Sequence, residues 1–168
     1  FNLEEKSAKI ILSCDGSGIA EVFQGNFQIS WHIINTKPTE ITISLPDNLS
    51  FLEKVTEEKK LQFNPHLTRL ILPIFSPIRL INIEGETSLP RKNQTPKTKY
   101  LAYGSSITHG ASALRPTGGY AMKTAQHLGV DLINLGFGGG AHCAKQIADY
   151  IAERKDWDYV YLEKGINM

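Results

Sequence analysis

Two adjacent serines at the end of a short apolar run are the residues of this chain whose setting best supports chemistry. Residues 100–103 predict a buried strand, and Gly104-Ser105-Ser106 follows directly. A serine at the carboxyl end of such a strand can act as a nucleophile, because the backbone turns sharply and helix-start N–H groups can face an oxyanion. In the alternative interpretation, Ser106 has only a structural role as the N-cap of a helix. The Gly-x-Ser-x-Gly pattern of the α/β-hydrolases is not matched.

Two later apolar runs also end in residues that acyl transfer can use. Residues 131–135 lead into a glycine-rich loop, 136–140, and residues 159–162 are followed by Gly165-Ile166-Asn167. A glycine loop can bring a backbone N–H close to a substrate, and an asparagine amide offers a further donor to an oxyanion. Because the carboxyl ends of parallel strands meet at one sheet edge, we expect the three segments to converge.

The segments between these strands have helical patterns. Residues 120–128 contain helix formers and end at Gly129, and residues 141–154 repeat apolar side chains at the spacing of one helix face. Strand, helix, strand, helix and strand in this order predict a parallel sheet with helices on its faces. We therefore expect a three-layer α/β domain over residues 95–168.

The first 94 residues follow a different pattern, and only four of the 14 glycines lie before residue 99. Short segments alternate between apolar and polar residues and are separated by turn residues, which predicts a β-sandwich or jelly-roll domain over residues 1–94. Residues 88–98 are polar and indicate a linker, and the charged run 53–60 indicates a solvated surface segment. The predicted strands are residues 9–13, 19–23, 27–34, 40–45, 68–72 and 78–84.

Composition argues against several functional classes. The 18 Lys and Arg residues nearly balance 17 Asp and Glu residues, and no basic run predicts nucleic-acid binding. No apolar stretch reaches the length of a membrane span, and no signal-peptide pattern is present, although the chain begins at Phe1. Cytoplasmic and exported locations both stay open. Cys14 and Cys143 are expected to be buried thiols, and the five histidines lack metal-ligand spacing, so neither metal nor cofactor is expected.

The three strand ends together resemble the SGNH (GDSL-like) hydrolase family. Gly104-Ser105-Ser106-Ile107-Thr108 is similar to the first block of that family, with Ser105 where the family usually has Asp. Residues 134–139 are similar to the second block. Gly165-Ile166-Asn167-Met168 is similar to the third block, Gly-x-Asn-Asp, with Met168 in place of the final Asp. The resemblance covers about residues 98–168 and rests on the order and position of three short motifs.

This resemblance implies a serine esterase that works through an acyl-enzyme without a cofactor. It implies that Ser106 is the nucleophile and that Gly139 and Asn167 help to form the oxyanion hole. The implied substrates are small or carbohydrate esters. A leading β-sandwich is typical of one bacterial subgroup, and residues 72–75 and 80–83 are similar to the end of its first domain. Candidate pocket residues are Ser105, His109, Arg115 and Tyr120.

One element of the family is missing from the sequence. The family supplies its general base and orienting carboxylate from an Asp-x-x-His block, and no Asp of this chain has a His three residues later. We therefore expect a truncated chain whose base lies outside residues 1–168 and which is nearly inactive alone. The oligomeric state is not predicted.

Two other functions stay open at this point. Gly136-x-Gly138-x-x-Ala141 matches the dinucleotide fingerprint, with Glu163 after the next strand as a possible ribose ligand. In the other alternative, the N-terminal domain binds carbohydrate and the α/β part is inert. His142, at the start of the predicted helix 141–154, is expected to be structural.

Overall fold

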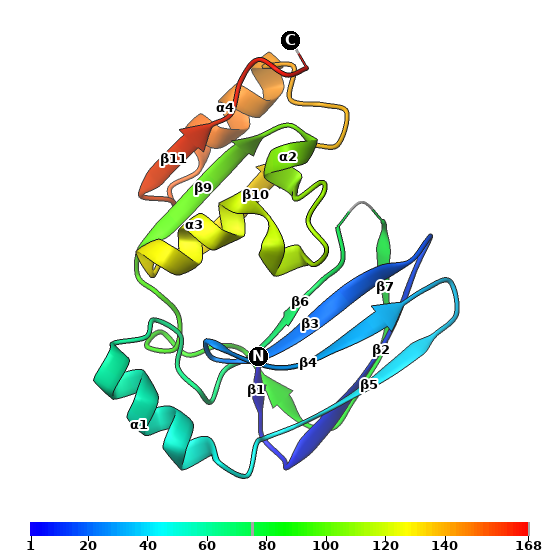
Figure 1. Ribbon diagram of the computed structural model, residues 1–168, viewed down its shortest axis with the longest axis vertical. Coiled ribbons are helices and arrows are strands. Elements are labelled where there is room, and N and C mark those ends of the chain that lie inside the picture. Colours follow the sequence, from blue (N-terminus) through cyan, green and yellow to red (C-terminus); the bar gives the residue numbers. More distant parts are fainter. Residues whose placement is uncertain (75, 168) are drawn as a thin grey trace. The chain divides into compact units, whose positions relative to one another are not determined.

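The computed structural model describes residues 1–74 and 76–167, and it forms two compact units, Phe1–Thr95 and Pro96–Met168 (Figure 1). The division expected from the sequence falls after residue 94. The parts of the sequence resemblance that fall on Phe75 and Met168 lie outside the described residues. Each unit is described by itself.

Antiparallel strands form the first unit (Figure 1). One sheet has the order β5-β2-β7, a second has the order β4-β3-β6, and β1 pairs with β8. All six predicted strands form, with ends that shift by at most two residues. The strands are β1 (Asn2–Leu3), β2 (Ser7–Cys14), β3 (Gly18–Gln24), β4 (Phe27–Ile34), β5 (Thr39–Ser44), β6 (Thr68–Ile71), β7 (Ile78–Glu84) and β8 (Thr87–Ser88).

The core of the first unit follows from the alternation of apolar residues. Every second residue of β2 points inward, and β3, β4 and β5 add further apolar side chains, so both three-stranded sheets contribute to one core. The β-sandwich itself stays a prediction. The buried core residues are Leu3, Ala8, Ile10, Leu12, Cys14, Ala20, Val22, Ile34, Ile41 and Ile43.

The charged run 53–60 lies on the surface as expected, with no residue buried, and most of it forms helix α1 (Leu49–Lys59), which ends at a left-handed Lys60. One expectation for the first unit needs correction. The predicted linker 88–98 is anchored near its middle, because Gln94 is buried and donates to Asn2 Oδ1 at 2.6 Å. Sequence reasoning treated Gln94 as solvated because nothing local indicates its distant partner.

A parallel three-stranded sheet forms the second unit, as predicted, with the order β10-β9-β11. The strands are β9 (Lys99–Gly104), β10 (Asp131–Gly136) and β11 (Tyr159–Leu162). Gly104 lies opposite Gly136, and Tyr103 lies opposite Leu162, so the carboxyl ends are level. The segments that follow these three strands therefore begin at the same sheet edge.

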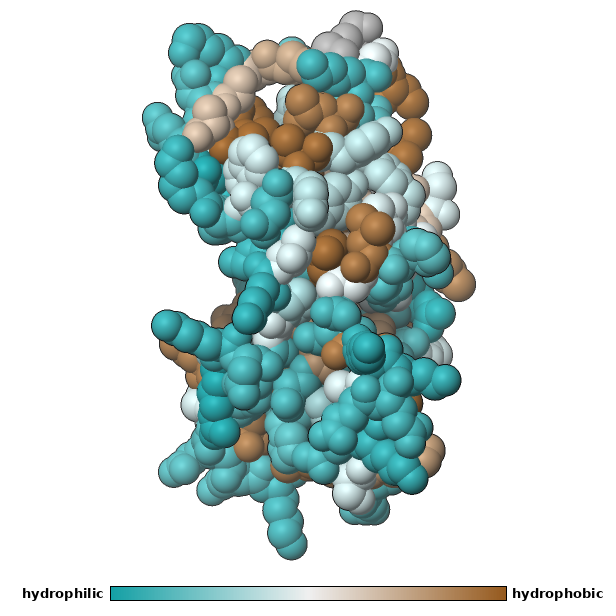
Figure 2. All heavy atoms as spheres, turned by 90° about the vertical axis from the view of Figure 1, so that its left-hand side faces the viewer, coloured by the Kyte–Doolittle hydropathy of each residue, from teal (hydrophilic) through white to brown (hydrophobic). Residues whose placement is uncertain are grey.

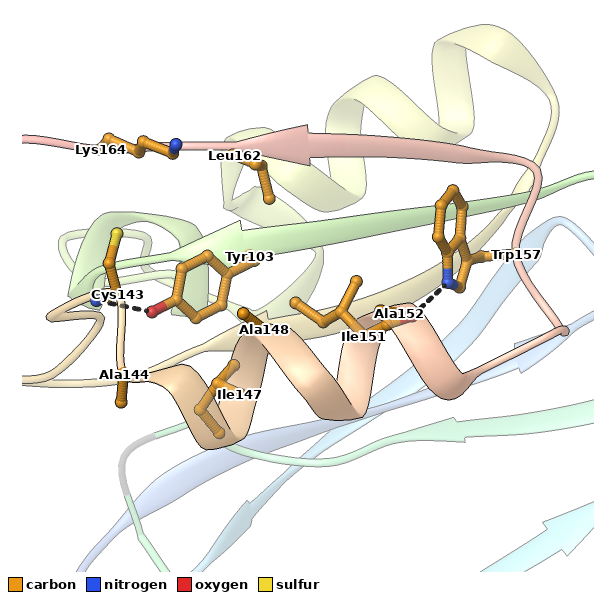
Figure 3. A pocket seen from close by; sticks show the side chains of 10 residues that line it. All are labelled: Tyr103, Cys143, Ala144, Ile147, Ala148, Ile151, Ala152, Trp157, Leu162 and Lys164. Atoms are coloured by element: carbon orange, nitrogen blue, oxygen red, sulfur yellow. Dashed lines mark hydrogen bonds between the residues drawn. The ribbon is translucent and has the colours of Figure 1, made fainter.

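Helices cover the sheet of the second unit. Alternate residues Tyr100 and Ala102 of the central strand pack against α3 (Tyr120–Leu128). Tyr103 points the other way, toward α4 (Lys145–Glu153) (Figure 3). Two shorter elements, α2 (Ser106–His109) and the 3₁₀ turn η1 (Pro116–Gly118), lie between β9 and α3.

Helix α4 is shorter than the predicted helix 141–154. Ala141 and Cys143 have φ values of 67° and 54°, in the left-handed region, so the chain cannot be helical there. The helix begins at Lys145, and His142 lies in the loop before it. The apolar periodicity identified the helix face correctly and placed its start four residues too early.

The surface of the second unit is apolar along β11. All four residues of this edge strand are exposed, from Tyr159 at 63% to Val160 at 40%. Figure 2 shows apolar side chains gathered on this unit in a view from another side. Cys143 is also exposed, contrary to prediction, whereas Cys14 is buried as expected. Among the residues described, no helix combines the length and apolar character needed to cross a membrane.

Candidate functional site

The two adjacent serines have different environments. Ser105 is 1% exposed and is the N-cap of α2, where its Oγ accepts a hydrogen bond from Ile107 N at 3.3 Å. Ser106 is the first residue of α2 and is partly exposed. The capping role considered for Ser106 therefore belongs to Ser105, and Ser106 is the more exposed of the two serines.

Glu163, the residue after β11, holds the turn that contains both serines (the serine turn, residues 104–108). Its Oε2 accepts hydrogen bonds from Ser105 Oγ at 2.6 Å and from Ser105 N at 2.7 Å. It accepts a third from Thr108 Oγ1 at 3.1 Å. The two Ser105 bonds, with help from Thr108, hold the pKa of Glu163 below its ordinary value because they stabilise the carboxylate.

The hydrogen bonds continue from Glu163 to helix α3. Thr108 Oγ1 lies 2.7 Å from the hydroxyl of Tyr120, the first residue of α3. Burial raises the pKa of Tyr120 above its ordinary value, and the negative charge of Glu163 adds to this rise. The pocket candidate Tyr120 is thus joined to the serine turn through Thr108.

Asn134 connects the end of β10 to the same turn. Its Nδ2 donates to Thr108 O at 3.0 Å, and its Oδ1 accepts from Gly136 N at 2.8 Å. Sequence reasoning used Asn134 only as the start of the second block. In the structure it links the serine turn to the strand that leads into the glycine loop.

We expect Asn134→Ala to lower the free energy of unfolding of the second unit by about 1 kcal/mol, because two hydrogen bonds of an exposed side chain are lost. Asn134→Asp is the matched variant, since it keeps the acceptor for Gly136 N and loses the donor to Thr108 O. Chemical denaturation measures the free energy of unfolding of this unit when Trp157 fluorescence is followed in a Trp31→Phe background. Equal stability of all three proteins would contradict the bridging role.

The predicted oxyanion residues lie in two segments that contact each other. Gly139 has a φ of 69°, and a Cβ there would meet nothing within 4 Å. Asn167 Nδ2 donates to O of the next residue, Gly140, at 2.7 Å. His142 Nδ1 lies 2.7 Å from Asn167 O, so this nitrogen must be the protonated donor. These contacts join the loop after β10 to the segment after β11, and Asn167 keeps a second amide N–H.

His109 ends helix α2 and is half-buried, so it is not a freely solvated loop residue. Burial lowers its pKa, which favours the neutral imidazole at neutral pH.

An apolar cavity of about 380 Å³ lies between α4 and the sheet (Figure 3). Ile147, Ala148 and Ile151 of the helix face Tyr103 and Leu162 of the strands across it. Trp157 bounds one end and donates to Ile151 O at 3.1 Å, and Cys143 N donates to the Tyr103 hydroxyl at 3.3 Å at the other end. The cavity therefore belongs to the face of the sheet that α4 covers.

The dinucleotide alternative is not formed in this structure. Its fingerprint needs a glycine turn that opens directly into a helix, whereas β10 ends at Gly136 and α4 begins at Lys145. Glu163, considered as a ribose ligand, is bound instead to Ser105 and Thr108. Within residues 1–74 and 76–167, no three His, Cys, Asp or Glu side chains come together as metal ligands.

Comparison with known families gives a match that covers the serine turn and the whole parallel sheet. Residues 97–162 match the GDSL-like lipase/acylhydrolase family. This match lies within the second unit, which is similar to that family over most of its length. No curated protein matches the chain in sequence at the significance required.

Solved structures show the same fold. A salicylyl-acyltransferase, SsfX3, from a tetracycline biosynthetic pathway aligns with 98% of this chain at 19% identity and a TM-score of 0.65. A protein described as a GDSL-like lipase from Bacteroides ovatus aligns with 94% at 23% identity and a TM-score of 0.61. An acetyl xylan esterase from the rumen bacterium Butyrivibrio proteoclasticus aligns with 96% at 12% identity and a TM-score of 0.55. The chain spans 46%, 47% and 53% of these structures, so about half their length.

Proposed function

We propose that this GDSL-like unit carries the nucleophile of a serine esterase and that Ser106 is this nucleophile. The observation that supports the choice is the contrast between the two serines. The Ser105 hydroxyl is buried and bound to Glu163, whereas Ser106 is partly exposed at the start of α2, at the end of the central strand. In this proposal Ser106 Oγ gives its proton to a general base and attacks an ester carbonyl. The bond from the acyl carbon to the alcohol oxygen breaks, the alcohol leaves with that proton, and water later hydrolyses the acyl-enzyme that remains.

The proposed oxyanion donors are the N–H groups of Ser106 and Gly139 and the amide of Asn167. Support comes from the level ends of the three strands and from the bond between Asn167 and Gly140, next to Gly139. An N–H donor aimed at the developing negative charge stabilises the transition state by about 3 kcal/mol. The open space around Gly139 leaves its backbone accessible.

Attack by Ser106 also needs a general base within hydrogen-bond reach of Oγ, and a histidine is the usual choice. We do not assign this role to His109, because it lies on the same short helix, three residues after Ser106. His142 is not assigned either, because its ring makes no hydrogen bond to Ser106 among the described residues; the contact it does make is from Nδ1 to Asn167 O.

We propose small or carbohydrate esters as the substrate class. This choice follows the names of the structural relatives, which include an acetyl xylan esterase and a carbohydrate esterase from Clostridium thermocellum solved with cellohexaose. An acyltransferase is also among these relatives. Experiment must therefore decide whether the acyl group passes to water or to another acceptor.

The proposal is tested by covalent labelling in the natural protein that contains this chain. A fluorophosphonate probe reacts with an activated serine, and peptide mass spectrometry then identifies the modified residue. We expect one label per chain on Ser106 and none on Ser105. Heat-denatured protein is the control, because labelling there would reflect chemical reactivity without a folded site. Label on Ser105, or on neither serine, would contradict the assignment.

A further inference from the structure

Glu163 is the residue of the second unit whose contacts the family resemblance does not explain. It comes directly after β11, the strand that pairs with β9, and β9 leads into the serine turn. In the sequence it is far from that turn. One oxygen, Oε2, accepts three hydrogen bonds, all from the turn: two from Ser105 and one from Thr108. Ser105 precedes Ser106 and Thr108 follows it by two residues. The carboxylate is therefore bound to the turn on both sides of the proposed nucleophile, through the Ser105 backbone N–H and two side-chain hydroxyls.

The serine turn is built closely around this carboxylate. A Cβ on Gly104 would lie 2.6 Å from Glu163 Oε2 and 2.1 Å from Thr108 Oγ1. Both distances are shorter than real contacts, so only glycine allows the carboxylate and the threonine hydroxyl to approach the turn this far. Glu163 N in addition donates to Tyr103 O at 2.9 Å, which holds the backbone of residue 163 against the central strand. The glutamate therefore has a fixed position on both its backbone and its side chain.

The residue at position 105 fits this arrangement. The family resemblance places an Asp there, and this chain has Ser. An ionised carboxylate at 105 could only accept hydrogen bonds and would face a second carboxylate, whereas the Ser105 hydroxyl donates to Glu163 and still accepts from Ile107 N. Tyr120, the titratable group that reaches Glu163 through Thr108, is neutral at neutral pH, because the ordinary pKa of a tyrosine is already well above that pH and burial raises this one further.

We propose that Glu163 is a positioning residue that holds Ser106 in its attacking geometry through Ser105 and Thr108. This inference rests on the proposed function of Ser106. Hydrogen bonds to an ionised acceptor are about twice as strong as neutral ones, so the charge of Glu163 contributes as well as its shape. The low pKa of Glu163 keeps that charge at the pH where an esterase works.

The test compares Glu163→Gln with Glu153→Gln in the natural protein that contains this chain. Glu163→Gln keeps the size and an acceptor oxygen and removes the charge, and Glu153 is an exposed glutamate of α4 that serves as the matched control. With p-nitrophenyl acetate we expect Glu163→Gln to lower kcat about tenfold and to leave KM within about twofold. The control keeps both constants. A kcat of Glu163→Gln within twofold of wild type would overturn the inference.

A second experiment separates positioning from general stability. Ser105→Ala removes one donor to Glu163, and the double variant with Glu163→Gln completes a double-mutant cycle. We expect the loss of kcat in the double variant to be smaller than the product of the two single losses, because both changes remove the bond between Ser105 Oγ and Glu163. Independent, multiplicative losses of kcat would contradict the proposal, and so would a loss that parallels the fraction of unfolded protein.

A wrong assignment of Ser106 can be told apart from a wrong role for Glu163. If Ser106→Ala stays active, the esterase assignment to Ser106 is wrong whatever the Glu163 variants do. The same cycle measured on unfolding in the Trp31→Phe background, with Trp157 as the reporter, then still shows whether Glu163 and Ser105 are coupled. If the effects of the two substitutions on the free energy of unfolding are simply additive, the claim that Glu163 holds the turn through Ser105 is overturned as well.

Discussion

Ester hydrolysis is expected to disappear when Ser106 is replaced by alanine. In the natural protein that contains this chain, kcat/KM for p-nitrophenyl acetate should fall on the order of 10⁴-fold or more, because removal of the nucleophile leaves only binding and oxyanion stabilisation. The unfolding midpoint should barely change, since Ser106 is a small, partly exposed side chain at the start of α2. Initial rates at several substrate concentrations measure the first quantity, and thermal denaturation measures the second.

Ser105→Ala is the matched control for this prediction. It removes the neighbouring hydroxyl and keeps the bond from the backbone N–H of residue 105 to Glu163. We expect a loss of about tenfold, small beside that of Ser106→Ala, because the nucleophile stays in place. Equal turnover by wild type and Ser106→Ala would sink the assignment of Ser106, and a larger loss in Ser105→Ala than in Ser106→Ala would point to Ser105.

The sequence predicts the strands and helices of this chain well because their apolar periodicity is local. Strands β4, β7 and β11 and helix α3 begin and end where the pattern places them. Errors occur where distant contacts decide the structure. The start of α4 was missed because Ala141 and Cys143 take left-handed conformations that no local pattern indicates, and Gln94 was placed in a linker because its partner Asn2 lies 92 positions away.

The candidate site was predicted only in part for the same reason. Gly104, Ser105 and Ser106 belong to one short motif, so the turn could be located from the sequence. The contrast between a buried Ser105 and an accessible Ser106 depends on Glu163, which comes from another strand. A carboxylate directly after an apolar strand that is parallel to the motif strand is the signal that could have indicated this partner.

Gly136 is the position in the second unit where we expect an added methyl group to lower activity and stability most. A Cβ there would lie 2.0 Å from His109 N, 2.4 Å from His109 Cα and 2.6 Å from Thr108 C. All three are backbone atoms, so no side-chain rotation can relieve the clash, and α2 must move away from β10. Because α2 begins at Ser106, this movement shifts the proposed nucleophile too.

We therefore expect Gly136→Ala to lower kcat about a hundredfold and the free energy of unfolding of the second unit by about 2 kcal/mol. Gly16→Ala in the first unit is the control, because its Cβ would meet only Ser76 Oγ at 3.4 Å, an ordinary contact. Initial rates and Trp157-monitored denaturation in the Trp31→Phe background measure the two effects. Wild-type kinetics in Gly136→Ala would show that α2 does not rest on the end of β10, and the placement of Ser106 by that contact would then be wrong.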